Sequence, residues 1–311
     1  MKLTKRRTSI FFTWFASILL LGTILIPPAY AGMGVVPSKI ELTLDRGESE
    51  DVPLIIPNNS PTPLKVSFST WDFARDERGI PYPIGPKDVK TFRGCGSWVT
   101  FASKKIHVDT GKAGKAVFTV TVPPDAEFGT YYTYIKAFGA PSPLKKAGVA
   151  INYIINALLL VTVGRKGGVP VLKRSAYLKS FFVKRFNFTS PVLFTTKISN
   201  TGNVHLNLTG KIQIKKGKVI METIPIKEST LLPMNTFPII KAWGNPPLFG
   251  KFKAEFTGNV GLDKPLTDQK TFWVISWKLI VGILGLFVLL IFRKSWKKIK
   301  TRLASRRNLP G

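Results

Sequence analysis

Short runs in which apolar and polar residues alternate make up most of the chain after Val35. The segments KIELTL at 39–44 and LKVSF at 64–68 alternate residue by residue, which places successive side chains on opposite faces of a strand. Proline, glycine and asparagine separate these runs, and none of them keeps a period of 3.6 residues. The pattern therefore predicts an all-β protein built from antiparallel sandwiches.

The runs form two series, which predict two tandem immunoglobulin-like β-sandwiches at residues 32–164 and 165–271. The first series ends in the nearly continuous apolar run INYIINALLLVTV at 151–163, where β-branched residues and asparagine favour a strand over a helix. GRKGG at 164–168 is predicted to be a short flexible linker. About seven further strands are expected in the second series.

Three local patterns add detail to this layout. In DAEFGTYYTYIKA at 125–137, a tyrosine near the start of the strand can return its hydroxyl to the turn backbone, as in the tyrosine corner of immunoglobulin-like sandwiches. NTGN at 200–203 is typical of a turn that joins two strands. Residues 72–96 are rich in glycine, proline and charge, which indicates a long loop or a small extra hairpin.

Near the C-terminus, FWVISWKLIVGILGLFVLLIF at 272–292 predicts a transmembrane helix, because residues 279–292 are all apolar or glycine. The basic segment 293–311 that follows is expected in the cytoplasm by the positive-inside rule. We thus expect a single-pass type I protein of the cell membrane with both sandwiches extracellular or periplasmic. The residues expected to anchor the span at the two interfaces are Trp273, Trp277, Lys278, Arg293, Lys294, Lys297 and Lys298.

Residues 1–31 have the layout of a secretory signal peptide. A basic start and an apolar stretch lead to Ala29-Tyr30-Ala31, so we expect the mature chain to begin at Gly32. The pair Arg6-Arg7 allows a twin-arginine signal, but Ser9 stands where a hydrophobic residue is expected, which favours ordinary secretion. Without cleavage, the apolar stretch would remain as a second anchor.

The formal net charge of +29 is unevenly distributed. Four cations lie in residues 1–31 and eight lie after Phe292, so +17 remains on the external part, and no Asp or Glu occurs between Glu127 and Glu222. Such a surface attracts polyanions, and the expected location favours anionic wall polymers over nucleic acid; a merely solvated face is the alternative. The residues predicted to form an anionic-polymer surface are Arg165, Lys166, Lys173, Arg174, Lys179, Lys184, Arg185, Lys215, Lys216 and Lys218.

The sequence offers little to catalysis. Cys95 is the single cysteine, so no intrachain disulfide can form, and we expect it to be a buried small side chain. His107 and His205 lie about a hundred residues apart and outside any catalytic or metal-binding motif. The carboxylates of residues 72–88 are interleaved with cations, as in a solvated loop. We therefore expect no enzyme, no cofactor and no metal.

The whole layout resembles the WxL-interacting proteins, bacterial cell-surface proteins with two immunoglobulin-like domains and a C-terminal transmembrane helix. At residue level the resemblance rests on VPSKIELTLDRGESEDVPLIIPNNS at 36–60, VPPDAEFGTYYTYIKA at 122–137 and SNTGNVHLNLTGKIQI at 199–214. The first two segments are also similar to periplasmic pilus chaperones. The resemblance implies that the first domain binds peptidoglycan and the second holds a secreted surface protein. The charged segment 72–96 and the acid-free middle depart from that family.

Two non-enzymatic functions compete. The first is a membrane-anchored surface protein that tethers a cell-wall polymer or a secreted surface protein. The second is a membrane-anchored, pilus-chaperone-like assembly factor that binds subunits by strand pairing. An exposed apolar edge on the strand at 151–163 would favour the second, whereas pairing of that strand on both edges would count against it. An enzyme would need His107 or His205 beside carboxylates in a cleft.

Overall fold

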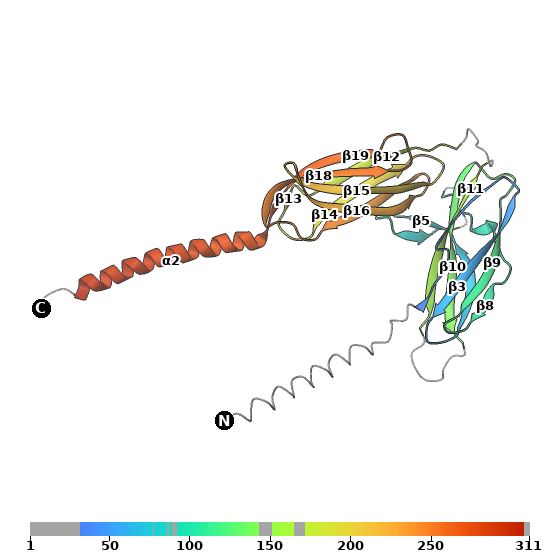
Figure 1. Cartoon of the computed structure of the whole chain (residues 1–311), viewed down its shortest axis with the longest axis horizontal. Helices are drawn as coiled ribbons and strands as arrows, with labels where there is room; N and C mark the ends of the chain where they lie inside the picture. The colour runs from blue at the N-terminus through green and yellow to red at the C-terminus, as the bar shows by residue number, and fades with distance from the viewer. Residues whose placement is uncertain are drawn as a thin grey trace, which may run out of the picture.

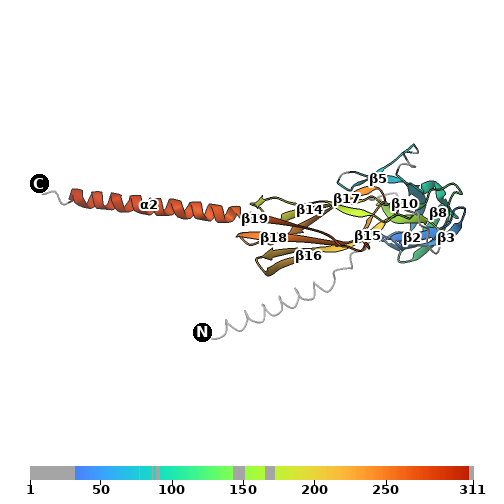
Figure 2. The same ribbon diagram turned by 90° about the horizontal axis from the view of Figure 1, so that it is seen from above.

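The computed structural model describes residues 32–76, 78–85, 87–88, 92–142, 151–164 and 172–307, with backbone only at 295 and from 297 onward. The predicted signal peptide lies outside these residues. Most of the described chain is strand, and it forms two pairs of facing sheets followed by a helix (Figure 1). Seen from above, the helix continues the long direction of the second pair of sheets (Figure 2).

The first pair of sheets, here called the N-terminal sandwich, contains residues from Gly32 to Val163. Its four-stranded sheet consists, in spatial order, of β1 (Gly32–Met33), β3 (Ser49–Asn59), β9 (Ala113–Thr121) and β7 (Val99–Phe101). Its five-stranded sheet consists of β2 (Lys39–Leu44), β11 (Tyr153–Val163), β10 (Gly129–Pro141), β4 (Leu64–Trp71) and β8 (Lys105–Val108). A short 3-10 helix, η2 (Gly96–Trp98), precedes β7.

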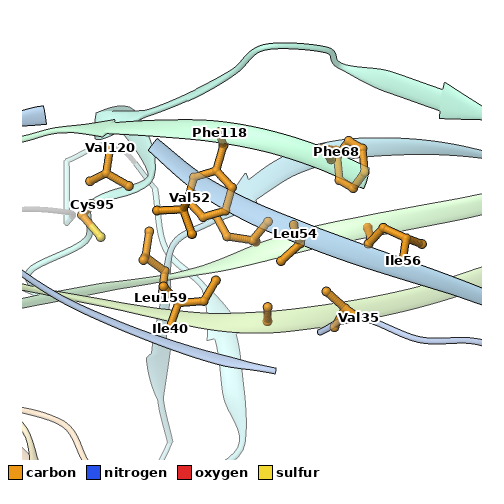
Figure 3. Packing of buried hydrophobic residues seen from close by; sticks show 14 of the residues in the cluster. Val35, Ile40, Val52, Leu54, Ile56, Phe68, Cys95, Phe118, Val120 and Leu159 are labelled. Carbon is orange, nitrogen blue, oxygen red and sulfur yellow. The ribbon is translucent and has the colours of Figure 1, made fainter. Parts of the chain in front are cut away.

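The core of this sandwich follows directly from the two-residue alternation. Val52, Leu54 and Ile56 of β3 all point inward, where they meet Phe118 of β9 and Leu159 of β11 (Figure 3). Between them, the outward residues of β3 are exposed or half-buried. Alternation in the sequence thus positions the layer that holds the two sheets together.

The second pair, the C-terminal sandwich, contains residues from Ala176 to Ile275. One sheet consists of β12 (Ala176–Val183), β14 (Val192–Asn200) and β17 (Asn235–Trp243). The other consists of β13 (Phe186–Asn187), β19 (Leu266–Ile275), β18 (Phe249–Asn259), β15 (Leu206–Lys216) and β16 (Val219–Leu231). Its core is aromatic: Phe194, Phe252 and Phe272 contact one another or Trp243 at ring-centroid distances of 5.2–6.3 Å.

Three of the local predictions are confirmed. The hydroxyl of Tyr131 accepts a hydrogen bond from the backbone N–H of Glu127 at 3.1 Å, which is the contact expected of a tyrosine corner. The run at 151–163 is a strand, β11, as its β-branched residues predicted. The turn at 200–203 joins two strands, as predicted; these are β14 and β15, which belong to different sheets, so the turn carries the chain across the sandwich.

The charged segment 72–96 contains a small hairpin, the second of its two predicted forms. Its strands are β5 (Phe73–Arg75) and β6 (Pro81–Pro83). Within the turn, the carboxylate of Asp76 accepts N–H groups of Arg78 and Ile80. These hydrogen bonds lower the pKa of Asp76, with the Ile80 N–H as the largest cause. The charges here therefore organise a turn.

The predicted span 272–292 is wrong at its start. Phe272 and Val274 point into the core as part of β19, and the helix α2 (Trp277–Arg307) begins five residues later. In this stretch the buried side chains alternate with a period of two, as in a strand, and the apolar run of the helix begins only after it. In the part of the chain that the structure describes, no helix combines the length and the hydropathy of a membrane-crossing segment. The described apolar side chains of α2 are nonetheless largely exposed, for example Leu289 at 67%.

Candidate binding edge and the corner between the sandwiches

The last strand of the N-terminal sandwich is paired on both edges over only part of its length. β11 pairs with β10 along all of residues 153–163. On its other edge, the parallel partner β2 covers only Leu158 to Val163, opposite Lys39 to Leu44. Over residues 153–157, no strand among the described residues pairs with that edge. We call this five-residue segment the open edge.

The backbone groups that the open edge presents follow from hydrogen bonds farther along β11. The N–H of Leu158 donates to the carbonyl of Ser38 at 2.9 Å, and the N–H of Gly164 donates to Leu44 at 3.0 Å. Residues two apart in a strand direct their backbone groups to the same edge. The N–H and C=O of Ile154 and Asn156 therefore face the open edge, whereas those of the residues between them face β10.

Apolar side chains flank the open edge. On the inner face, Tyr153 and Ile155 pack against the hydrophobic core. On the outer face, Ile154 is 58% exposed and lies beside Phe138 of β10, its register partner. Asn156 lies beside Lys136, and its carboxamide oxygen is buried without a hydrogen-bond donor among the described residues. The site thus combines free backbone groups, apolar side chains and an unpartnered acceptor.

The outer face of the same sheet is covered where the two sandwiches meet, which we call the corner. Phe73, Tyr132, Leu160 and Leu232 form a buried apolar cluster there, and Leu232 comes from the C-terminal sandwich. Burial raises the pKa of Tyr132 to about 12. The covered half of β11 is therefore part of a packed interface between the sandwiches.

The β5–β6 hairpin joins the sandwiches a second time. The guanidinium of Arg75 lies 5.2 Å from the ring centroid of Phe237 in β17. Gly79, with φ +80°, lies so close to Pro238 that an added Cβ would stand 3.1 Å from two of its ring carbons. Figure 1 shows β5 in the angle between the two sandwiches. A segment expected to be solvated loop is thus a bridge between them.

A polar cluster completes the corner. The ammonium of Lys39 contacts the carboxylates of Glu41 and Glu228, the latter at 3.4 Å from the C-terminal sandwich. His205 Nε2 lies 3.6 Å from Glu41, and its Nδ1 lies 3.1 Å from the hydroxyl of Thr130. Burial lowers the pKa of His205, although the Glu41 carboxylate opposes this shift. Burial would raise the pKa of Glu41, but the Lys39 hydrogen bond and nearby His205 bring it below its usual value.

A cavity of about 410 Å³ opens beside this cluster, and its mixed apolar and polar lining includes the side chains of Glu41, Thr162, Arg174 and His205. The arrangement of Thr130, His205 and Glu41 has the residue types of a nucleophile, a base and a carboxylate. Thr130, however, is fully buried, and its hydroxyl is also hydrogen-bonded to Thr162 at 2.9 Å. The three side chains therefore fasten the corner and offer no accessible nucleophile.

The other sequence-derived candidates have structural roles or stand alone. Cys95 is fully buried in the core of the N-terminal sandwich, as predicted, and burial raises the pKa of its thiol well above the usual value. His107 lies on β8, 3.3 Å from Asp109, with 54% of its side chain exposed. In the described residues, no group of three or more His, Cys, Asp or Glu side chains could hold a metal ion.

The predicted anchor residues lie at and after the start of α2. Trp273 belongs to β19, where it is half-buried and lies 5.8 Å from Phe249. Trp277 and Lys278 open the helix and are exposed. Arg293 and Lys294 are exposed farther along it, whereas the side chains of Lys297 and Lys298 lie outside the described part.

The described members of the predicted anionic-polymer surface lie in different parts of the C-terminal sandwich and at the corner. Lys173 and Arg174 lie at the corner, and Lys179 lies along β12. Lys184, Arg185, Lys215, Lys216 and Lys218 lie at the opposite end of the C-terminal sandwich, near the start of α2. Arg165 and Lys166 fall outside the described residues. The acid-free sequence window therefore supplies two separate basic regions.

Sequence reasoning missed the contacts at the corner, because they join residues more than 70 positions apart. In the charged segment 72–96, apolar residues such as Phe73 were a sequence signal of a packed interface. The limit of the open edge was also missed. It depends on where β2 ends its pairing, and the alternation in 39–44 does not encode that point.

Comparison with known proteins gives structural likeness only. No protein-family model and no curated protein matches the chain. Among solved structures, the YadV chaperone aligns over 77% of this chain and 99% of its own at 12% identity and a TM-score of 0.40. The Pseudomonas aeruginosa CupB2 chaperone aligns over 77% and 100% at 9% identity and a TM-score of 0.39.

A third similar structure is the CsuC–CsuE chaperone–tip adhesion subunit pre-assembly complex of Acinetobacter baumannii. It aligns over 79% of this chain and 99% of the matched chain at 10% identity and a TM-score of 0.40. Such scores carry no inference about what this chain binds. Membership of the WxL-interacting family remains a prediction.

Proposed function

We propose that this chain is a non-enzymatic binding protein that captures an extended segment of a partner protein by strand addition at the open edge of β11. The observation that carries the proposal is the unpaired backbone of Ile154 and Asn156 beside exposed apolar side chains. An added strand gains affinity from backbone hydrogen bonds and specificity from pockets for alternate side chains. Two immunoglobulin-like domains would present this edge.

The partner segment should be apolar at alternate positions. Residues of an added strand that lie on the inner face would extend the core beside Ile155, and those on the outer face would pack against Ile154. A donor at the position facing Asn156 would satisfy the carboxamide oxygen that lacks one. This proposal corresponds to the strand-pairing function expected from the sequence, but it limits the binding edge from residues 151–163 to residues 153–157.

The same proposal includes a membrane anchor in α2, although the described helix does not itself reach the length and hydropathy of a membrane-crossing segment. Its support is the apolar stretch 279–292, in which every large side chain from Ile280 to Phe292 is at least 38% exposed. The N-terminus would then lie outside the membrane and the basic end of α2 inside. Retention in the membrane pellet after an alkaline carbonate wash is the expected result, and release by that wash would contradict the anchor.

Strand capture is tested by photo-crosslinking in the native host. Benzoyl-phenylalanine at position 154 of the full chain should crosslink to a partner, which mass spectrometry then identifies. Asn156→Pro removes one edge-facing N–H and should abolish the crosslink, whereas Asn156→Ala keeps that N–H and should preserve it. Equal crosslinking by both variants, crosslinking only to a second copy of this chain, or no crosslink at all would contradict the proposal.

Tethering of a cell-wall polymer such as peptidoglycan stays a separate prediction. The described basic residues are divided between the corner and the end of the C-terminal sandwich next to α2, so these residues offer the polymer no continuous binding surface. Co-sedimentation of the full chain with purified cell walls, lost on charge reversal at the corner residues Lys173 and Arg174, would support it.

A further inference from the structure

The end of the C-terminal sandwich from which α2 leaves has an unusual surface, here called the helix-proximal end. Three connections meet there: the β12–β14 connection, which contains β13, the β15–β16 turn and the β17–β18 loop. Their shared position follows from register, since Phe186 pairs with Trp273, Phe249 pairs with Ile275, and Lys215 lies opposite Lys253. Figure 1 shows β13 beside the start of α2.

Large apolar side chains at this end are exposed to solvent. Each connection contributes some of them, and the start of the helix adds Trp277 at 52% exposure. The others are Phe186 at 45%, Phe188 at 49%, Val219 at 63%, Ile220 at 52%, Leu248 at 55% and Phe249 at 53%. Isolated exposed apolar residues are ordinary, but a group of this size at one end of a domain marks an interaction surface.

Cations accompany these apolar groups. Lys184, Lys216, Lys218 and Lys251 form no ion pair with any carboxylate among the described residues. Arg185 lies 5.6 Å from the ring centroid of Phe186. Among the described residues, the nearby Lys215 and Lys253 are paired instead, both with the single carboxylate of Glu255. Unpaired cations among exposed aromatic rings match an interface between water, anionic headgroups and acyl chains.

The helix is held firmly against this end. The N–H of Ser276 donates to the carbonyl of Leu248 at 2.7 Å, and the N–H of Trp277 donates to the carbonyl of Phe188 at 3.0 Å. Two of the three loops thus satisfy backbone donors at the helix start. Because α2 continues the long direction of the sandwich (Figure 2), a bilayer crossed by α2 would face the helix-proximal end.

The length of the apolar stretch adds an independent reason. Residues 279–292 rise about 21 Å as a helix, whereas the hydrocarbon core of a bilayer is about 30 Å thick. A short stretch is accommodated when flanking residues enter the interface or the bilayer thins. The aromatic and aliphatic side chains around Trp277 are in position to make up part of the deficit.

We propose that the helix-proximal end is a lipid-facing surface that binds anionic phospholipid headgroups through Lys184, Arg185, Lys216, Lys218 and Lys251, with its exposed apolar side chains in the headgroup layer. This inference rests on the anchor in the proposed function. The C-terminal sandwich would then be fixed on the bilayer, and the N-terminal sandwich would stand away from it.

The test uses the full chain in vesicles, with Cys95→Ala and a bimane label on Val219→Cys. Nitroxide-labelled acyl chains should quench this label in vesicles of phosphatidylcholine with phosphatidylglycerol, and less in phosphatidylcholine alone. A label on Lys112→Cys, in an exposed turn of the N-terminal sandwich, should remain unquenched in both. Circular dichroism and carbonate retention of each variant are measured alongside.

Charge reversal separates headgroup binding from mere proximity. Lys216→Glu with Lys218→Glu should reduce quenching at position 219 at least twofold and remove its dependence on phosphatidylglycerol. The matched pair Lys104→Glu with Lys105→Glu, equally exposed in the N-terminal sandwich, should change neither. Quenching that is absent, or unaffected by lipid charge and by reversal, in protein that resists carbonate would overturn the surface proposal alone. Release by carbonate would instead overturn the anchor.

Discussion

In both sandwiches the last strand has one edge that is only partly paired, and the two sandwiches differ in the side chains along that edge. In each, an early strand runs parallel to the last one, β2 against β11 and β13 against β19. β2 covers six residues of β11, whereas β13 covers only Phe186 opposite Trp273 and Asn187 opposite Val274. β19 pairs with β18 on one edge along its whole length. On its other edge no described strand pairs with residues 266–272, a longer stretch than the open edge, although β12 approaches it.

The side chains on the two unpaired stretches differ. In β19, the two alternate positions before Phe272 and Val274 are Lys270 and Asp268, which form an ion pair at 3.2 Å with side chains 46% and 31% exposed. On the inner face of β11, the open edge keeps apolar residues, Tyr153 and Ile155. Charged side chains on an edge strand, especially lysine, are a common protection of sheet edges against pairing. The contrast supports the proposal that an added strand pairs with β11 and not with β19.

The largest expected effect contrasts the covered half of β11 with its open half. Leu160 is fully buried at the corner, so Leu160→Ala should lower the free energy of unfolding by about 2–5 kcal/mol. Ile154→Ala, at 58% exposure, should change it by less than about 0.5 kcal/mol while weakening partner capture. Urea denaturation of both variants measures the difference, and similar losses would mean that the two halves are equally packed.

The next prediction places a charged side chain, like those on β19, on the open edge of β11. Ile155→Lys places an inward charge on the open edge and should reduce crosslinking to the partner roughly tenfold, or about 1.4 kcal/mol. Thr267→Lys, on the unpaired stretch of β19, is the matched control and should leave capture unchanged. Loss of capture in both variants would remove the functional distinction between the edges.

The reverse exchange should create a new adhesive edge. Asp268→Ile with Lys270→Ile removes the ion pair, whose contribution to stability is at most about 1 kcal/mol, and leaves an apolar unpaired strand. Analytical ultracentrifugation of the detergent-solubilised chain should show a mass that rises with concentration. A variant that stays monomeric at all concentrations would mean that the approach of β12 already blocks this edge.

The smallest effect concerns pH at the corner. Burial lowers the pKa of His205 below 6.5, with Glu41, Lys39 and Arg174 as the charged groups around it. The unfolded chain therefore binds a proton more readily, so the full contribution to stability is present above about pH 6.5 and is lost as pH falls through the lower folded pKa. Calorimetry between pH 7 and 5 should show a decrease in Tm from this group, and the decrease should be smaller in His205→Gln. An identical pH dependence in that variant would exclude His205 as its source.

Much of the β architecture was predictable because alternation is local. Val52, Leu54 and Ile56 identify an inward face from five consecutive residues, and the β-branched residues of β11 identify a strand. The start of α2 was misplaced because Phe272 is equally apolar in a strand core and in a membrane span. The corner was beyond prediction, since Lys39 meets Glu228 and Thr130 meets His205 only after both sandwiches have folded.

The β5–β6 hairpin has a consequence for the chain as a pair of fragments. Arg75 and Gly79 reach Phe237 and Pro238 without help from the covalent connection between the sandwiches, and Leu232 adds an apolar contact at the corner. Noncovalent contacts thus contribute to fixing the angle between the two sandwiches. Separately produced halves should recognise each other and reassemble, so that the molecule behaves as a heterodimer whose subunits share one polypeptide.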